Sequence, residues 1–359
     1  MAGLAISLVL AVVLGFAAHR ASVCTVRAVA EAMHSKTAFM FASIGKSVLW
    51  ILVFTLPVFW LVPSTAASLA GWQLNAAAVA GGFLFGLGAG LNGACAYSTM
   101  ARLVDGEVAM IVAIVGFAVG VGVFVELTDF GWLQRPANVS PMIATVIDWG
   151  GILSAILVAW AIYEAIRLWR TRPRGKDIGD LVLSPKYRLS SAALLLGLTG
   201  SAIFLLFGSA GYTSTFELVI EGALGTRPWP IAGRWLLLLA VLFGMLLSTV
   251  QRGAFRPDWR PRAAWLRNLS GGMLMGLGAA MAPGGNDTFV LYGVPNLSPN
   301  ALPAYAAMTL GIVAALLIAR SLFGIVARVA CKDDVFVSDT WTPEGTRPTI
   351  EVSPATKSA

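Results

Sequence analysis

The sequence GGFLFGLGA at residues 81–89 is repeated almost unchanged at residues 271–279, where the chain reads GGMLMGLGA. Seven of the nine positions are identical. A glycine-containing break follows each copy, NGAC at residues 92–95 and APGG at residues 282–285. Apolar segments that are broken at corresponding places in two halves of a chain are typical of membrane proteins built from inverted repeats around a central site. The repeat therefore predicts an all-α fold in which short, broken and re-entrant helices surround a central path.

The composition of the chain excludes a soluble fold. Of its 359 residues, 57% are hydrophobic even before the 38 glycines are counted, and only 12% are charged. Soluble globular proteins contain about 45–50% apolar residues with glycine included, and about 25% charged residues. A soluble fold of this size could not keep so much apolar surface from water. We therefore expect a polytopic membrane protein in contact with the lipid bilayer.

The charge and the metal-ligating residues argue against several classes of function. The net charge is +7, but the basic residues lie in short connecting segments and form no stripe with interleaved aromatic residues. We therefore expect no nucleic-acid partner. The three cysteines include no C-x-x-C pair, which excludes a disulfide framework and a zinc ribbon. His19 and His34 are the only histidines, too few for a His-rich metal site or for haem ligation, so no metal and no cofactor are expected.

Apolar stretches along the chain give the candidate membrane spans. A helix needs about 20 apolar residues to cross the hydrocarbon core of a bilayer. Four of these candidate spans are short or interrupted by glycine, and we expect them to be half-helices or re-entrant segments: 3–19, 77–94, 234–250 and 270–282. The full set of candidate spans is 3–19, 38–62, 77–94, 107–127, 144–168, 189–209, 234–250, 270–282 and 300–328.

The charges of the connecting segments predict the orientation. Segments 169–188 and 251–268 each carry at least five Lys or Arg residues, so the positive-inside rule places both in the cytoplasm. The two spans between them make an even number of crossings, as this placement requires. Segment 210–233 carries Glu217, Glu221 and a single arginine, and we expect it to face outward.

The repeat and the loss of apolar character near residue 331 predict how the chain is divided. A transmembrane transporter domain over residues 1–330 would contain repeat one at about 3–127, connecting helices at about 128–233 and repeat two at about 234–328. Residues 331–359 are expected to be a soluble, loosely ordered tail.

The first break contains a candidate anion-binding cysteine. Cys95 follows Asn92 and Gly93 at the point where a short polar helix with Arg102 is predicted to begin. Free backbone N–H groups at the start of a helix attract anions, and a thiol is a soft, weak donor suited to holding a sulfur-bearing anion briefly. The alternative is a buried cysteine that acts only as a small hydrophobic residue. The repeat geometry favours the functional interpretation.

A second candidate cysteine ends the first span. Cys24 lies between Arg20 and Arg27, which make its surroundings electropositive. These arginines either attract anions or merely anchor the helix at the lipid headgroups. Cys331, at the start of the tail, is a much weaker candidate.

The break in the second repeat is polar, since residues 283–288 read PGGNDT. Asn286 or Asp287 could simply cap the next helix, but an ionisable residue near membrane depth is by default a functional candidate. Gly285 aligns with Cys95, so we place these three residues on the same path. Asp287 must then point away from it or be protonated, because a carboxylate repels anions. Substitution of Gly285 by cysteine is expected to be tolerated.

In these features the chain resembles the YeeE/YedE family of bacterial inner-membrane proteins, over roughly residues 1–328. The resemblance depends on the arginine-bearing turn that ends in Cys24, on the glycine pattern that leads to Gly93-Ala94-Cys95, and on the second repeat at 271–287. It implies an inverted-repeat helical fold of hourglass outline, cysteines along a central path, and uptake of thiosulfate. The family pattern has a third cysteine where this chain has Gly285.

The resemblance implies a multi-pass transporter, and not an enzyme, that imports a small sulfur-containing anion, most simply thiosulfate. The expected anion-attracting residues are Arg20, Arg27 and Arg102, and the expected path residues are Cys24, Asn92, Gly93, Cys95, Gly285, Asn286 and Asp287. Two alternatives remain open. One is a membrane sulfurtransferase that forms a persulfide on Cys95 and passes the sulfur to a small cytoplasmic carrier protein. The other is a transporter of another oxyanion or of a selenium species.

Overall fold

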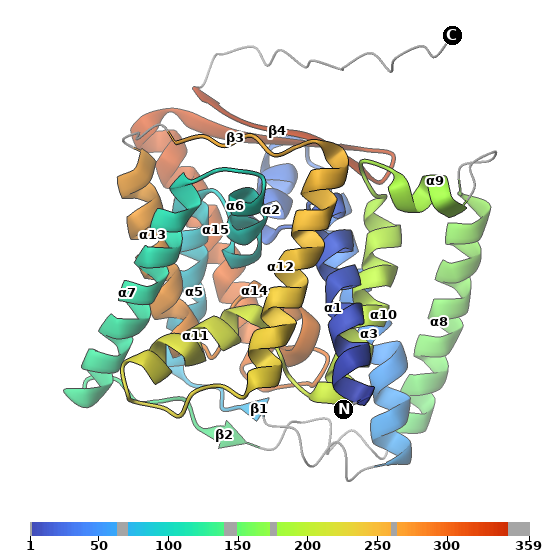
Figure 1. Cartoon of the computed structure of the whole chain (residues 1–359), viewed down its shortest axis with the longest axis horizontal. Coiled ribbons are helices and arrows are strands. Elements are labelled where there is room, and N and C mark those ends of the chain that lie inside the picture. The colour runs from blue at the N-terminus through green and yellow to red at the C-terminus, as the bar shows by residue number, and fades with distance from the viewer. Residues whose placement is uncertain (1, 63–70, 140–148, 173–177, 260–263, 344–359) are drawn as a thin grey trace.

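The computed structural model describes residues 2–62, 71–139, 149–172, 178–259 and 264–343. Figure 1 shows a helical bundle with small β elements at its two ends. Strands β3 (Ile325–Lys332) and β4 (Val335–Pro343) lie at the end that also carries α9 (Ile178–Leu183). We call this end the hairpin face. Strands β1 (Gly71–Trp72) and β2 (Asn138–Val139) pair at the opposite end, which we call the β1–β2 face.

The expected polytopic membrane protein is confirmed. In the described part of the chain, eight helical segments are long and apolar enough to cross a membrane. Each contains at most two charged residues in its most apolar 18-residue window. The segments are Gly3–His34, Phe39–Leu61, Ala76–Val104, Ala109–Asp129, Gly150–Arg170, Leu189–Phe207, Ala232–Arg252 and Ala301–Phe323.

The same order of helices occurs in two sets. Each set contains two units, and each unit consists of a long helix, a break, a short helix and a long helix. The first set is α1 (Ala2–Ala21), α2 (Thr25–His34), α3 (Phe39–Leu61), α5 (Ala76–Asn92), α6 (Ala96–Val104) and α7 (Ala109–Asp129). The second set is α10 (Leu189–Phe207), α11 (Tyr212–Ala223), α12 (Ala232–Arg252), α13 (Ala264–Met281), α14 (Asn286–Thr288) with the π-turn Phe289–Gly293, and α15 (Ala301–Phe323). Helix α8 (Gly150–Arg170) and α9 connect the two sets. In helix order the second set begins at Leu189, earlier than the boundary at 234 that the sequence favoured.

Helices α1 and α12 are continuous, so the expectation that 3–19 and 234–250 are half-helices is wrong. Their glycines mark a close crossing. A β-carbon on Gly15 would lie 2.1 Å from the carbonyl oxygen of Val241, and one on Gly244 would lie 2.0 Å from that of Val12. Only glycine lets two helix backbones approach this closely. Helix α13 is likewise an unbroken helix of 18 residues, and its break comes after Met281.

The repeated glycines arrange α5 and α13 in opposite directions. A β-carbon on Gly81 would lie 2.8 Å from the carbonyl oxygen of Gly278, and one on Gly271 would lie 2.8 Å from that of Gly88. The contact is reciprocal because Gly81 and Gly88 occupy the same repeat positions as Gly271 and Gly278. Helices α5 and α13 are therefore antiparallel, which is the relation expected of an inverted repeat.

Two further glycines let the long helices α15 and α7 pack closely against this pair. A β-carbon on Gly86 of α5 would lie 1.9 Å from the carbonyl oxygen of Met308 in α15. A β-carbon on Gly276 of α13 would lie 2.0 Å from that of Phe117 in α7. The glycine patterns therefore pack the two repeats against each other and against α7 and α15.

Substitution of Gly86 by alanine should destabilise the protein strongly. The new methyl group meets backbone, which cannot rotate away, and overpacking of this kind costs about 1–3 kcal/mol or more. We expect a lower melting temperature in detergent, measured by size-exclusion chromatography after heating. Gly45→Ala in α3 is the matched control, because no atom lies within 4 Å of its β-carbon position. The control should melt at or slightly above the wild-type temperature, since alanine favours a helix by about 0.5–1 kcal/mol. Equal melting of the two variants would contradict the close crossing.

The described ends of the two arginine-rich segments lie on the same face. The guanidinium group of Arg20 donates to the carbonyl oxygen of Leu183 at 3.2 Å and to the side chain of Gln251 at 2.6 Å. The backbone N–H of Arg256 donates to the carbonyl oxygen of Asp105 at 2.9 Å. These contacts join the ends of both segments beside the hairpin face.

The C-terminal segment differs from the expected loosely ordered tail up to residue 343. Helix α15 ends at Phe323 because Gly324 takes a left-handed conformation, with φ of +61°. The chain then forms an antiparallel hairpin in which Val329 pairs with Asp339. The remainder of the expected tail, residues 344–359, lies outside the described residues.

Candidate functional site

The two breaks of the first helical set bring Cys24 and Cys95 together. Cys24 is the N-cap of α2 and Cys95 is the N-cap of α6. Their sulfur atoms lie 3.5 Å apart although 71 positions separate them in the sequence. Each residue is 1% exposed. The two thiols therefore form a pair in the interior of the bundle.

The breaks have a local cause in the backbone. Helix α5 ends because Gly93 takes a left-handed conformation, with φ of +73°, and its N–H bonds back to the carbonyl oxygen of Gly90 at 3.2 Å. The side-chain amide of Asn92 then donates to the carbonyl oxygen of Ala94 at 3.0 Å and to the hydroxyl of Thr99 at 2.8 Å. These bonds fix the turn that presents Cys95.

Polar groups from other helices surround the thiol pair. The Asn286 side-chain amide lies 3.9 Å from the sulfur of Cys95, and the Cys95 thiol lies 3.7 Å from the Ser98 hydroxyl. The Thr25 hydroxyl donates to the Asn286 side-chain oxygen at 2.6 Å and lies 3.3 Å from the Tyr305 hydroxyl. Both repeats thus contribute weak, uncharged donors to one small region, which we call the waist.

Four short helices begin at the waist or beside it. Helices α2 and α6 begin at the two cysteines. Helix α11 begins next to α14, since Asp287 accepts hydrogen bonds from the hydroxyl of Thr213 and from its backbone N–H, the latter at 3.2 Å. The rings of Tyr97 and Tyr212, at the starts of α6 and α11, are 5.4 Å apart. Helix N-termini carry partial positive charge, so the starts of α2 and α6 favour an anion at this depth, whereas the start of α11 is already occupied by the Asp287 carboxylate.

A cavity of about 150 Å³ lies between the waist and the hairpin face, and we call it the hairpin-side vestibule. Arg27 there pairs with Asp339 at 2.8 Å, and Arg102 pairs with Glu107 at 2.6 Å. The lining residues are Cys24, Arg27, Gly93, Ser98, Arg102, Glu107, Asp339 and Trp341. The vestibule combines two cations with a thiol and a hydroxyl, the groups that coordinate a small oxoanion.

A larger cavity of about 400 Å³ lies toward the β1–β2 face, and we call it the β1–β2-side vestibule. Arg227 lines it and pairs with Glu221 at 3.0 Å. Arg234 donates to the carbonyl oxygen of Ser209 at 2.8 Å and forms no ion pair with the described residues. Thr288 is 7% exposed and lines the same cavity. These groups give the vestibule an excess of positive charge and free hydrogen-bonding capacity.

The acid that lines this vestibule does not cancel its positive charge. Glu217 is buried, and burial together with the neighbouring carboxylate of Glu221 raises the pKa of Glu217 to about 8. Near neutral pH most of the Glu217 population is therefore protonated, and the carboxyl group can donate a hydrogen bond to an anion instead of repelling it.

One short segment separates the two vestibules. Pro283 and Thr288 line the β1–β2-side vestibule, and Asn286 between them reaches the sulfur of Cys95. Cys95 contacts Cys24, which lines the hairpin-side vestibule. The waist therefore lies between the two vestibules along this line of contacts.

Other path residues of the sequence analysis have supporting positions. Asn92 is 1% exposed, and its side-chain hydrogen bonds stabilise the turn at the first break. Gly93 lines the hairpin-side vestibule. The Asp287 carboxylate accepts hydrogen bonds from Thr213 at the start of α11. Gly285 is packed tightly: a β-carbon there would lie 2.8 Å from the Phe85 ring and 2.8 Å from the Thr213 methyl group. This packing argues against the expected tolerance of Gly285→Cys.

Arg20, expected to attract anions, lines neither of the two vestibules. Its side chain is buried, with 2% of the residue exposed. Besides Gln251 and the carbonyl oxygen of Leu183, it donates to the Ser248 hydroxyl at 3.1 Å and to the carbonyl oxygen of Ser184. All of these bonds hold α1 against α12 and the α9 connection. Arg27 and Arg102, in contrast, both line the hairpin-side vestibule.

Sequence analysis does not identify several residues of the site. Thr25, Ser98 and Tyr305 are ordinary hydroxyl residues whose role depends on contacts across the bundle. Arg227 lies in segment 210–233, where the two glutamates dominate the interpretation, and Arg234 is the first residue of the candidate span 234–250. Their proximity to the polar PGGNDT break could not be read from sequence spacing. Among the described residues, no group of three or more His, Cys, Asp or Glu side chains could hold a metal ion.

A protein-family model described as sulphur transport matches residues 20–314. The matched region contains both glycine repeats, both cysteines of the waist and the Asn286 break. A search of curated proteins returned no match.

Proposed function

Because this chain belongs to the sulphur-transport family, the YeeE/YedE family, we propose that the sulfur compound it carries is thiosulfate, imported through the waist between its two vestibules. The family membership makes the chain a multi-pass membrane transporter of sulfur compounds. The observation that supports this path best is the buried contact of 3.5 Å between the sulfur atoms of Cys24 and Cys95, with an arginine-lined vestibule on each side.

In this proposal the β1–β2 face lies outside the cytoplasm and the hairpin face lies inside it, in a bacterial inner membrane. The arginine-rich segments 169–188 and 251–268 support this orientation by the positive-inside rule. An anion would first collect in the β1–β2-side vestibule, where Arg234 offers a guanidinium group without a carboxylate partner among the described residues. A cleft lined by one sign of charge concentrates ions of the opposite sign.

At the waist the anion would exchange water for weak donors. The amide of Asn286 and the thiols of Cys95 and Cys24 follow one another along the line of contacts. Weak donors suit conduction, because an ion must be held firmly enough to enter and loosely enough to leave. The thiols stay protonated in this mechanism, since thiolates would repel a dianion, and no covalent step is required. Gly285, in place of the family's third cysteine, leaves the amide of Asn286 as the donor from the second repeat.

The test is uptake of ³⁵S-labelled thiosulfate into proteoliposomes, followed by intact-protein mass spectrometry of the carrier. We expect labelled thiosulfate inside the vesicles and an unmodified chain mass. A persulfide on Cys95, with no intact thiosulfate inside, would instead identify a sulfurtransferase that supplies a small cytoplasmic carrier protein. Uptake of selenite or sulfate without thiosulfate uptake would identify a different substrate.

Substitution of Arg234 by glutamine should raise the KM for thiosulfate about tenfold, because a charge-assisted contact is worth about 1.5–3 kcal/mol and 1.4 kcal/mol is tenfold in affinity. The maximal rate should change less, since the waist is untouched. Arg172→Gln is the charge-matched control, because Arg172 is exposed and stacks on Trp169 near the hairpin face. Initial uptake rates over a range of thiosulfate concentrations separate the two parameters. An unchanged KM in Arg234→Gln would remove this vestibule from the path.

A further inference from the structure

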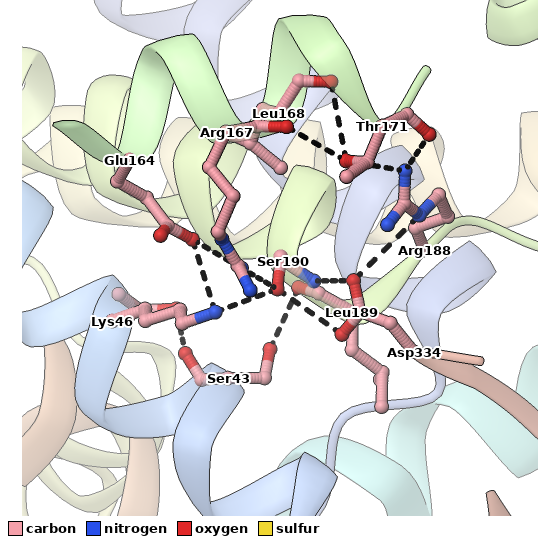
Figure 2. A network of polar contacts seen from close by, with 11 residues as sticks. Ser43, Lys46, Glu164, Arg167, Leu168, Thr171, Arg188, Leu189, Ser190 and Asp334 are labelled. Atoms are coloured by element: carbon pink, nitrogen blue, oxygen red, sulfur yellow. Dashed lines mark hydrogen bonds and ion pairs between the residues drawn. The ribbon is translucent and has the colours of Figure 1, made fainter. Parts of the chain in front are cut away.

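The β3–β4 hairpin lies across the face into which the hairpin-side vestibule opens. Its turn is fastened to the start of α10. The backbone N–H of Leu189 donates to the carbonyl oxygen of Asp334 at 2.7 Å, and the Ser190 N–H donates to the Asp334 carboxylate at 3.2 Å. Figure 2 shows Asp334 beside Leu189, Ser190 and Arg188 in this network. A carboxylate at a helix start stabilises the helix, so the turn is a firm anchor.

The other end of the hairpin is joined to α15 through Gly324, whose left-handed backbone marks the end of the helix. On the first strand, Val329 is 1% exposed and its carbonyl oxygen accepts a hydrogen bond from the Ser35 hydroxyl at 2.5 Å. Strand β3 is therefore attached to the body of the protein. Strand β4 is the part that lies over the vestibule.

Two side chains of β4 line the vestibule. The Asp339 carboxylate lies 2.8 Å from the Arg27 guanidinium group. An indole carbon of Trp341 lies 3.5 Å from the position that a β-carbon on Gly93 would take, so the ring covers the end of the first break. Both residues lie in the same cavity as the thiol of Cys24. The hairpin thus places one carboxylate and one large ring between the waist and the hairpin face.

The position of the Asp339 carboxylate is the one that a transported anion would take. A carboxylate and a small sulfur oxoanion compete for the same guanidinium donors. Arg27 and Asp339 keep 19% and 28% of their side chains accessible, so an anion in the vestibule can reach the guanidinium group and compete with the carboxylate. An arriving anion could therefore displace the carboxylate.

We propose that the β3–β4 hairpin is the inner gate of the transport path, and that Asp339 is a tethered competitor that occupies the anion site at Arg27 until substrate displaces it. This inference rests on the proposed function. The anion that passes this gate is a small sulfur oxoanion. The Trp341 ring covers the vestibule beside Gly93. The gate opens by rotation of the Asp339 and Trp341 side chains away from the vestibule, while the pairing with β3 and the Asp334 turn hold the β4 backbone in place.

The experiment measures the reaction of Cys24 with an anionic methanethiosulfonate reagent in the full-length protein in detergent, resolved by peptide mass spectrometry. Cys331 is distinguished by its peptide. Burial and the nearby Glu31 raise the pKa of Cys331 to about 12, so it reacts slowly. The variants are Asp339→Asn and Trp341→Ala. Asp333→Asn is the matched control, because Asp333 is exposed at the turn of the same hairpin, and asparagine tolerates its φ of +51°.

We expect Asp339→Asn to speed labelling of Cys24 by up to about fivefold, the range of a partly exposed ion pair, and Trp341→Ala to speed it as well. Thiosulfate should protect Cys24 at lower concentration in Asp339→Asn than in the wild type. The control should label at the wild-type rate. Unchanged labelling in both β4 variants, or equal acceleration in the control, would overturn the gate.

Uptake into proteoliposomes separates this inference from the proposed function. If the gate is correct, Asp339→Asn should take up thiosulfate faster than the wild type at low concentration. If wild-type protein fails to transport thiosulfate, the proposed function fails, but the labelling and protection results still decide whether the hairpin covers an anion site. If transport occurs and thiosulfate protects Cys24 equally in both proteins, the competitor role of Asp339 is wrong.

Discussion

Cys95→Ala should abolish thiosulfate uptake while the protein remains folded. The thiol is the one group at the waist that contacts Cys24, Ser98 and Asn286 together. Alanine removes this donor and acceptor and leaves only a small space, so the surrounding helices lose little packing. Uptake of ³⁵S-labelled thiosulfate and the melting temperature in detergent are the measurements. Uptake should fall to the level of empty vesicles, with a melting temperature close to that of the wild type.

Cys331→Ala is the control for loss of a thiol outside the waist, and it should transport normally. Cys95→Ser distinguishes the two chemistries of the site. A hydroxyl still donates a hydrogen bond but cannot carry a persulfide. Partial uptake by Cys95→Ser therefore supports the conduction mechanism, whereas complete loss in both Cys95 variants supports sulfur transfer. Wild-type uptake by Cys95→Ala would falsify the path through the thiols.

The repeat was enough to predict where the helices break and which residues follow the breaks. Both Gly93 and the PGGNDT segment lie where the sequence placed them, because glycine and proline act on the local backbone. The glycines of α1 and α12 were misjudged for a related reason. A glycine in an apolar stretch is compatible with either a break or a close crossing, and the partner backbone decides. At Gly15 and Gly244 that partner is the other helix of the pair.

The contacts between distant segments could not be predicted. Arg20 and Arg27 look alike in the sequence, seven positions apart and both beside Cys24. Arg20 contacts Ser248 and the α9 connection, whereas Arg27 lines a cavity, because α1 ends and α2 begins between the two residues. The hairpin was missed although its sequence has a signal. Gly324 is followed by the β-branched run IVARVACK, a DD turn and VFV, but the apolar stretch was extended to residue 328 as one span.

The aligned position of the missing third cysteine leads to the last prediction. Gly285 cannot accept a side chain without moving Phe85 or Thr213, so the donor from the second repeat must be the next residue. Asn286 alone in this break reaches the waist with a side-chain amide. Its oxygen is held by the Thr25 hydroxyl at 2.6 Å, which turns the NH₂ group toward Cys95. The orientation of the amide is thus fixed by a neighbour in the other repeat.

Asn286→Leu should reduce thiosulfate uptake at least about tenfold, because a lost hydrogen bond to a charged ligand is worth about 1.5–3 kcal/mol. Asn286→Asp is the second variant. It matches asparagine in shape and keeps the acceptor for Thr25, but it replaces the donor by a group that repels anions. Both should lose uptake, and both should keep a melting temperature near that of the wild type. Asn138→Leu, on an exposed strand at the β1–β2 face, controls for an added leucine. Normal uptake by Asn286→Leu would mean that the second break only packs the helices, and that the anion crosses without a donor from the second repeat.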